Sequence, residues 1–300
     1  METEMKKAVN PEDRKTFIGG SDMPAIMGLS RWSTPLGVWA YKTGKVVNKL
    51  DVEKPEFITL GLELEDFVAQ KFAKETGKAV RRDRRDFTHP EHPFLMAHID
   101  RRIVGTDELL EVKTCSAWKE KEWLGEDIPE EYILQVMWYL GLTGMKKGYI
   151  AVLIGGQKFI WKEVAFDKEL FDQMVVAAVE FWGFVQSDTQ PIAIGGDSGT
   201  LFELFPTSDI DGAVTFEGDD EISVNQMIDS RAAGIQAKKE VQAEIDDIDA
   251  KLKQLLGTNE KGRTGQFTYT WKTQQRKEFT VPASSSRVLR CRSNTKAVRA

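Results

Sequence analysis

The sequence has very few cysteines and no long apolar run. Cys115 and Cys291 are the only cysteines in 300 residues. Two cysteines cannot build a disulfide framework, a four-cysteine iron–sulfur cluster or a zinc ribbon, and they fit a reducing compartment. No stretch reaches the roughly 18 apolar residues that a membrane-spanning helix needs, and the first residues lack the apolar region of a signal peptide. We therefore expect a cytoplasmic protein without a membrane partner.

Acidic residues outnumber basic ones, 47 to 41, but the basic residues are concentrated locally. The formal net charge is −6, which argues weakly against a nucleic-acid partner. However, Arg81, Arg82, Arg84 and Arg85 are clustered, and the last 25 residues hold seven basic side chains against one acid. A protein that acts on a polyanion needs local positive surface and not a positive total. The composition therefore leaves nucleic-acid chemistry open.

Helix and strand patterns alternate along the first part of the chain. Apolar periodicity and end signals, such as Thr34-Pro35 at a start and Gly77 and Gly144 at ends, predict helices at 34–41, 57–75, 130–142 and 168–185. Strand patterns separated by turn residues predict hairpins at 95–114 and 147–166. This order predicts a central mixed β-sheet flanked by helices, in the α/β or α+β class.

The rest of the chain predicts an appendage. A linker region rich in Gly, Asp and Ser precedes a long charged helix at 222–256, and a small hairpin is expected from 266–272 and 277–281. Within the helix, a coiled-coil-like seam with 4-3-4-3 spacing is formed by Val241, Ile245, Ile248, Leu252 and Leu255. The seam is short, so packing onto the core and packing onto a partner both stay open. The expected divisions are a core at 1–190, a linker region at 191–220, and a helix, hairpin and basic tail at 221–300.

Residues 95–114 carry the most informative chemical pattern. They indicate two strands joined by Gly105-Thr106, a loop that suits a type II′ turn with glycine first. Counting back from that loop puts Asp100 opposite Glu111, with Cβ atoms roughly 4.5–5.5 Å apart. Two carboxylates this close repel each other unless a cation lies between them. Lys113 projects from the same face, so the hairpin outlines a hydrolytic metal site; a merely solvated hairpin face is the alternative.

Two helical motifs favour the metal site over the solvated face. Glu65 lies beside the apolar stripe of the 57–75 helix, so it can point inward, although an ordinary surface glutamate is the simpler interpretation. Gln135 and Tyr139 are four residues apart and share a helix face. There they could hold a phosphate or orient metal ligands, or they could be boundary residues of an amphipathic helix.

Two loop motifs add groups that suit nucleic acid. Arg14 precedes Gly-Gly-Ser21, whose N–H groups and hydroxyl could bind an anion, or which could be a flexible turn. Trp32 stands beside Arg31 and could stack on a base, or it could be a buried anchor of its loop.

The order and spacing of these motifs resemble those of the YqaJ-like viral recombinases, relatives of phage lambda exonuclease in the PD-(D/E)XK nuclease superfamily. The similarity covers about residues 10–185. Its matching segments are 18–22, 27–36, 61–65, 97–100, 110–114 and 135–144. Ile99 stands where the superfamily name implies a proline, a departure that the superfamily tolerates.

The resemblance implies a restriction-endonuclease-like core and a role for each matching residue. Asp100 and Glu111 would hold Mg²⁺ with the Val112 carbonyl, with Mn²⁺ able to substitute, and Lys113 would position or deprotonate the attacking water. Glu65 would complete the acidic cluster, and Arg14 and Ser21 match a pair that binds a 5′ phosphate. The catalytic set is Glu65, Asp100, Glu111, Lys113 and Gln135. The DNA-contacting set, with the tryptophan of the loop motif, is Arg14, Ser21, Trp32 and Tyr139.

The function implied is that of a Mg²⁺-dependent 5′→3′ exonuclease. It would degrade one strand of double-stranded DNA from its ends and leave 3′ overhangs for phage-type homologous recombination. The family's exonucleases often form toroidal trimers, work beside a single-strand annealing protein, and are encoded by phages or prophages of bacterial cells. Two alternatives stay open: a structure-specific or restriction-like endonuclease on the same core, and a non-catalytic module that keeps a relic of the nuclease core.

Overall fold

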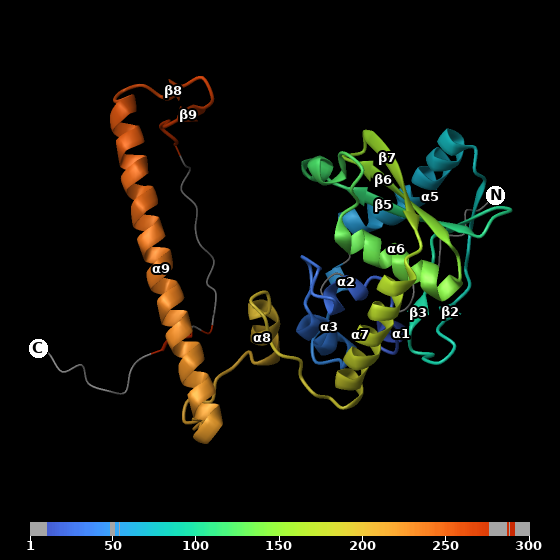
Figure 1. Ribbon diagram of the computed structural model, residues 1–300, viewed down its shortest axis with the longest axis horizontal. Helices are drawn as coiled ribbons and strands as arrows, with labels where there is room; N and C mark the ends of the chain where they lie inside the picture. Colours follow the sequence, from blue (N-terminus) through green and yellow to red (C-terminus); the bar gives the residue numbers. More distant parts are fainter. Residues whose placement is uncertain (1–10, 49–51, 54, 276–286, 288, 292–300) are drawn as a thin grey trace, which may run out of the picture. The chain divides into compact units, whose positions relative to one another are not determined.

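The chain divides into two units, Met1–Pro206 and Thr207–Ala300, in a computed structural model that describes residues 11–48, 52–53, 55–275, 287 and 289–291 (Figure 1). The predicted strand at 277–281 and most of the basic tail lie outside these described residues. No helix within the described part of the chain combines the length and the apolarity that a bilayer crossing demands.

A five-stranded mixed sheet forms the centre of the first unit. Its strands, in spatial order, are β1 (Val80–Arg82), β4 (Arg101–Ile103), β5 (Glu108–Cys115), β6 (Lys147–Ile154) and β7 (Lys158–Ala165). All neighbours pair antiparallel except β5 and β6, which are parallel. A parallel pair needs a crossover connection, and helix α6 (Glu130–Thr143) lies in that connection. The mixed sheet flanked by helices that the sequence predicts is confirmed.

The helices of this unit begin and end where local signals place them. Helix α3 (Pro35–Lys42) follows Thr34, whose Oγ1 accepts a hydrogen bond of 3.0 Å from the N–H three residues on. Helix α5 (Glu56–Thr76) and α6 end at Gly77 and Gly144, both with φ 71°, a conformation that glycine adopts without strain. The other helices among the described residues of this unit are α1 (Pro11–Arg14), α2 (Met23–Ile26), η1 (Ala117–Trp123, 3₁₀), α7 (Lys168–Gln186) and α8 (Ser198–Leu204).

The side chains of β5 alternate between two separate apolar layers. Leu110 and Val112 pack with the buried face of α5, which includes Val68 and Phe72. Leu109 belongs to the larger layer that contains α6. Because side chains alternate along a strand, the odd-numbered residues of β5 face α6. The sheet therefore presents different chemistry to α5 and to α6.

The predicted strand at 95–104 is wrong in one respect, because it is two strands. Met96–Ala97 forms β3, which pairs with β2 (Phe87–Thr88) in a small separate sheet, and β4 begins only at Arg101. The Trp138 Nε1–H of α6 donates a hydrogen bond of 2.9 Å to the Met96 carbonyl, which joins β3 to α6. Asp100 consequently lies in a bend between the two strands.

The predicted register of the hairpin is confirmed. Arg101 pairs with Leu110, and Arg102 pairs with Leu109. One further step along the chain sets Asp100 opposite Glu111. Gly105 has φ 79°, which a turn with glycine in first place requires.

The second unit consists of a long helix and a short hairpin among its described residues. Helix α9 (Gly218–Leu256) covers the predicted helix, and the five seam side chains are 37–77 % exposed. The hairpin pairs β8 (Lys261–Arg263) with β9 (Thr268–Thr270). The predicted strand at 266–272 contains β9, which pairs with the segment that directly follows α9, whereas its predicted partner 277–281 lies outside the described residues.

The contact between α6 and α7 predicts the effect of one added methyl group. A Cβ on Gly141 would lie 2.1 Å from the ring of Phe171, a buried side chain. We expect Gly141→Ala to destabilise the fold by about 1–3 kcal/mol, as overpacking does. Gly183→Ala on α7 is the matched control, because nothing lies within 4 Å of its Cβ. Urea denaturation measures both variants, and an unchanged midpoint for Gly141→Ala would contradict this packing.

Candidate active site

The two predicted carboxylates meet where β4 leaves the edge of β5. Asp100 Oδ2 accepts a hydrogen bond of 3.0 Å from the Val112 N–H, one residue beyond Glu111. The Asp100 carboxylate thus accepts the hydrogen bond that a backbone carbonyl of β4 would accept if the strand continued. Since the N–H and C=O of one strand residue point to the same side, the Val112 carbonyl lies on this same edge. Glu111 is only 3 % exposed.

Lys113 is the cation of this group. Its Nζ donates a hydrogen bond of 2.6 Å to Glu111 Oε1. Burial, together with the charge of Asp100, raises the pKa of Glu111 to about 8, although Lys113 opposes the shift. Burial alone lowers the pKa of Lys113, but the charges of Glu111 and Asp100 overcome this and raise it. Lys113 is therefore an ammonium ion at neutral pH, which suits positioning of water or stabilisation of negative charge and not acceptance of a proton.

Helix α6 covers the carboxylate pair with two polar side chains. Gln135 Nε2 donates a hydrogen bond of 2.7 Å to the Tyr139 hydroxyl, so the structure brings this predicted pair together. Burial, followed by the charges of Glu111 and Asp100, raises the pKa of Tyr139 well above its usual value. Its phenol stays protonated beside the carboxylates, where it can act as a hydrogen-bond donor.

The Gly-Gly-Ser loop lies against Tyr139. A Cβ on Gly20 would stand 2.5 Å from the Tyr139 Cε1 atom, so only glycine fits at this contact. Arg14 and Ser21, the predicted phosphate-binding residues, are both exposed. The loop that joins them therefore lies directly beside the site.

Lys42 organises this loop, and sequence reasoning missed it. Its Nζ donates hydrogen bonds of 2.7 Å to the carbonyls of Arg14 and Phe17 and to Asp22 Oδ2. Asp22 Oδ2 also accepts a bond of 2.9 Å from the Gly19 N–H. A signal was available, because Lys42 is three and four residues from the buried Trp39 and Val38, on the buried stripe of α3.

The structure does not bring Glu65 to the carboxylate pair. Glu65 lies on the buried face of α5 and accepts a hydrogen bond from Arg101, whose other nitrogen lies 3.0 Å from Asp66 Oδ1. Arg101 follows Asp100 in the chain and leaves β4 on the opposite face, toward α5. Sequence reasoning did not consider Arg101, and no local pattern marks it as the partner of Glu65.

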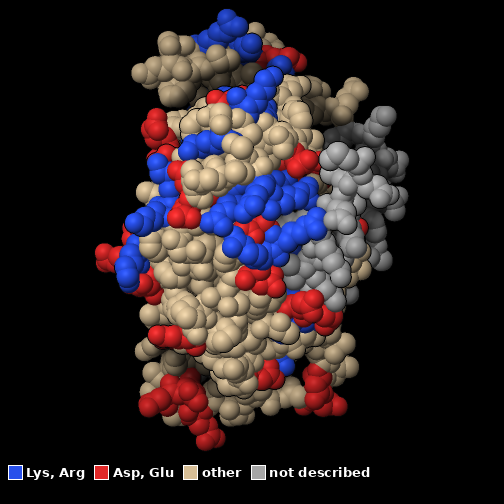
Figure 2. Space-filling view, turned by 90° about the vertical axis from the view of Figure 1, so that its right-hand side faces the viewer, with Lys and Arg blue, Asp and Glu red and all other residues tan. Residues whose placement is uncertain are grey.

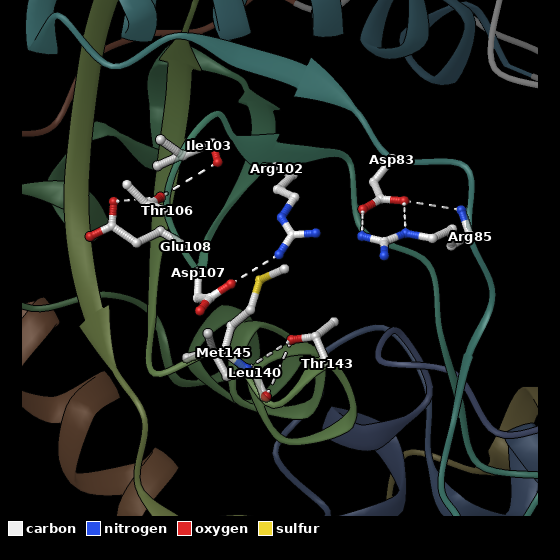
Figure 3. A network of polar contacts seen from close by, with 10 residues as sticks. All are labelled: Asp83, Arg85, Arg102, Ile103, Thr106, Asp107, Glu108, Leu140, Thr143 and Met145. Atoms are coloured by element: carbon white, nitrogen blue, oxygen red, sulfur yellow. Dashed lines mark hydrogen bonds and ion pairs between the residues drawn. The ribbon is translucent and has the colours of Figure 1, made fainter.

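Two arginines of the cluster at 81–85 are paired with acids, Arg85 with Asp83 and Arg82, at 3.8 Å, with Asp66. Figure 2 shows Lys and Arg side chains gathered in a band across one face of the molecule. Figure 3 shows Arg85 turned to Asp83 and Arg102 turned to Asp107, the latter pair at 3.0 Å. Arg81, opposite Arg102 in the β1–β4 pair, has no ion-pair partner among the residues that the structure describes. Arg81 and Arg102 line a surface hollow of about 400 Å³.

The donor set at the pair fits a divalent cation with oxygen ligands. Asp100 and Glu111 supply carboxylates and Val112 a carbonyl oxygen, which are the ligands that Mg²⁺ and Mn²⁺ prefer. Among the described residues, no group of three His, Cys, Asp or Glu side chains could hold a metal, so water would fill the remaining positions, as Mg²⁺ allows. A cation would also offset the repulsion that raises the pKa of Glu111.

Comparison with known proteins identifies related sequences. A family model described as the YqaJ-like viral recombinase domain matches residues 11–146. The "Uncharacterized protein YqaJ" of Bacillus subtilis (strain 168) is 37 % identical over 265 residues, which cover 87 % of this chain and 81 % of that protein.

Two solved structures are similar to part of this chain, and the first of them shows the fold. An alkaline exonuclease, LHK-Exo from Laribacter hongkongensis, is similar with a TM-score of 0.51 and 17 % identity over 59 % of this chain and 91 % of that chain. A phage related exonuclease from Haemophilus somnus 129PT is similar with a TM-score of 0.40 and 15 % identity, over 57 % of this chain and 96 % of that chain.

Glu111 predicts an unusual dependence of stability on pH. Its pKa is about 8 in the folded protein, against roughly 4.3 in an unfolded chain. Between these values the folded state holds a proton that the unfolded state releases, so stability should fall as the pH rises through this window. Glu111→Gln cannot ionise and should remove that loss.

The melting temperature in EDTA measures this effect. We expect Glu111→Gln to melt several degrees above the wild type near pH 9, and the difference to shrink toward pH 5. Glu63→Gln is the control, because Glu63 is exposed on α5 and should leave the pH profile unchanged. A wild-type profile that is flat between these pH values would contradict the buried, repelled state of Glu111.

Proposed function

Because the chain belongs to the YqaJ-like viral recombinase family, as its motifs predict, we propose that it is a metal-dependent exonuclease acting on double-stranded DNA. It degrades one strand 5′→3′ from an end and leaves 3′ overhangs for homologous recombination. The observation that carries the proposal is the pair of facing carboxylates, Asp100 and Glu111, with the Lys113 ammonium 2.6 Å from Glu111 at an open strand edge.

The metal is Mg²⁺, with Mn²⁺ able to substitute, held by Asp100, Glu111 and the Val112 carbonyl. When bound, it supplies charge neutralisation at the phosphate and lowers the pKa of a water molecule. Lys113 positions the attacking water and stabilises the charge that develops on the phosphate. Tyr139 donates a hydrogen bond from its protonated hydroxyl, and Gln135 holds that hydroxyl in place.

The loop from Arg14 to Ser21 receives the terminal phosphate of the strand. Its two ends are exposed, and its interior is closed around the buried ammonium of Lys42. The contact of Gly20 with Tyr139 joins this loop to the chemical centre. A 5′ phosphate here would direct the strand that carries it toward the carboxylates.

Glu65 acts as a positioning residue in this proposal. Its bond to Arg101 fixes the residue that directly follows Asp100, and Arg101 Nη1 also donates a bond of 2.8 Å to the Asp100 carbonyl. Glu65 therefore orients the bend that carries the first carboxylate. This role differs from direct membership of the acidic cluster.

Assembly extends the proposal beyond one subunit. We infer a ring of three chains that encloses the duplex, and a single-strand annealing protein that takes up the overhang. The exposed seam of α9 is available for packing between subunits or onto that partner. Of the predicted linker region at 191–220, only residues 207–217 lie between the first unit and α9. Light scattering on the purified protein tests the ring, and a processive monomer would exclude it.

Exonuclease activity makes a direct prediction for linear and circular DNA. The wild type with Mg²⁺ should digest a linear duplex, release label first from the 5′ end, and leave the same sequence intact as a closed circle. Asp100→Asn should lower the rate by at least about 100-fold, because it removes a charged ligand of the metal. Glu63→Gln, an exposed acid on α5, is the control. Cleavage of the circle would favour the restriction-like endonuclease, and no hydrolysis of either substrate would favour the non-catalytic module.

The loop at 14–21 predicts a preference for phosphorylated ends. A charge-assisted hydrogen bond contributes roughly 1.5–3 kcal/mol, which is about 10- to 150-fold in rate. The wild type should therefore digest 5′-phosphorylated duplex faster than 5′-hydroxyl duplex, and Arg14→Ala should slow only the phosphorylated substrate. Arg231→Ala, an exposed arginine of α9, should keep the full preference. Equal wild-type rates on the two ends would show that this loop binds something else.

A further inference from the structure

Two tryptophans of the first unit are exposed to an unusual degree. Trp32, in the loop before α3, is 73 % exposed, and Trp118, in η1, is 95 % exposed. Tryptophan side chains are highly buried on average, although they are rarely buried completely. Large apolar side chains that stay on the surface together mark a place where a ligand or partner binds.

The loop of Trp32 and η1 form one surface. Lys119, next to Trp118, places its Nζ 4.3 Å from the centre of the Trp32 ring. Arg31 Nη1 donates a hydrogen bond of 2.7 Å to Glu122 Oε1, at the other end of η1. We call Trp32, Trp118 and Lys119 the tryptophan rim.

The rim is anchored to the active site by a short series of contacts. Trp123, at the end of η1, is 1 % exposed and stacks on Tyr132 of α6 with ring centres 5.3 Å apart. The Tyr132 ring in turn lies 5.5 Å from the Nζ of Lys113. The rim is also close along the chain, because Trp118 follows Lys113 by five residues. A strand bound at the carboxylates would therefore pass near the rim.

The chemistry of the rim selects one class of ligand. Indole faces bind flat aromatic groups, and the Lys119 ammonium binds negative charge. Single-stranded nucleic acid offers both, because its bases have free faces and its backbone carries phosphates. In a duplex the base faces are covered, except at the last pair. A membrane surface or an apolar peptide would supply no aromatic face for each indole.

We propose that the tryptophan rim stacks on bases that have separated from the duplex at its end. This proposal rests on the proposed nuclease function. A terminal pair that opens loses its stacking on the duplex, and an indole face replaces part of that loss. The rim should therefore matter most for ends that are fully paired and least for ends that are already open.

Binding to single strands tests the rim without catalysis. The probe is a fluorescent single-stranded oligothymidylate, and its anisotropy is followed at constant salt in the Glu111→Gln background. Loss of one stacked base weakens binding by roughly 5- to 150-fold, so Trp118→Ala and Trp32→Ala should each show a loss in this range. Trp118→Phe keeps an aromatic face and should restore most of the affinity. Trp271→Ala, which removes a 52 % exposed tryptophan of the second unit, is the matched control.

Cleavage of two matched duplexes tests the opening of the end. One duplex has a paired end, and the other has two mismatched terminal pairs. Trp118→Ala in the otherwise wild-type protein should slow digestion of the paired end and leave the mismatched end close to the wild-type rate. Equal slowing of both substrates, or unchanged binding of the oligothymidylate, would overturn the proposal. If the wild type digests neither duplex, the nuclease function fails, and the anisotropy measurement still decides whether the rim binds bases.

Discussion

The arrangement of the site depends on one hydrogen bond, from the Val112 N–H to the carboxylate of Asp100. It ends the pairing of β4 with β5 by replacing a backbone acceptor with a side-chain acceptor. The same bond keeps Asp100 beside Glu111, although the two charges repel each other. Without it, β4 would continue along β5, and the strand edge that carries the Val112 carbonyl would be covered. The bend at Asp100 thus leaves the edge of β5 uncovered at Val112, beside the two carboxylates.

The two faces of the sheet divide the charges of one short segment. Asp100 faces α6, where Lys113, Gln135 and Tyr139 gather, whereas Arg101 faces α5, where Glu65 neutralises it. Alternation along the strand makes this separation unavoidable. The positive charge of Arg101 is therefore kept apart from the carboxylate pair, which would otherwise bind it in place of a cation. Glu65 on α5 therefore neutralises Arg101, a role that its place in the sequence motif does not indicate.

Local signals predicted the parts of the site that depend on neighbouring residues in the chain. The turn at Gly105 set the register of the hairpin, and the spacing of Gln135 and Tyr139 put both on one helix face. The separate course of β3 was not predictable, because one of its partners is Trp138, 42 residues away from its acceptor at Met96. The same holds for Arg101, which looks like an ordinary surface cation in the sequence but is enclosed by Glu65 and Asp66 of a distant helix. The roles of the individual site residues stay predictions.

The contact between Gly20 and Tyr139 fixes the distance between the Gly-Gly-Ser loop and the carboxylate pair. At Gly20 no side chain separates the Gly-Gly-Ser loop from the helix that covers the carboxylates, and the buried ammonium of Lys42 binds two carbonyls and one carboxylate of the loop segment. The distance between the two places is therefore set by van der Waals contact and not by a flexible linkage. A ligand that contacts both the Gly-Gly-Ser loop and the carboxylate pair must therefore have a length that matches this fixed distance. A ligand of another length can contact only one of the two places.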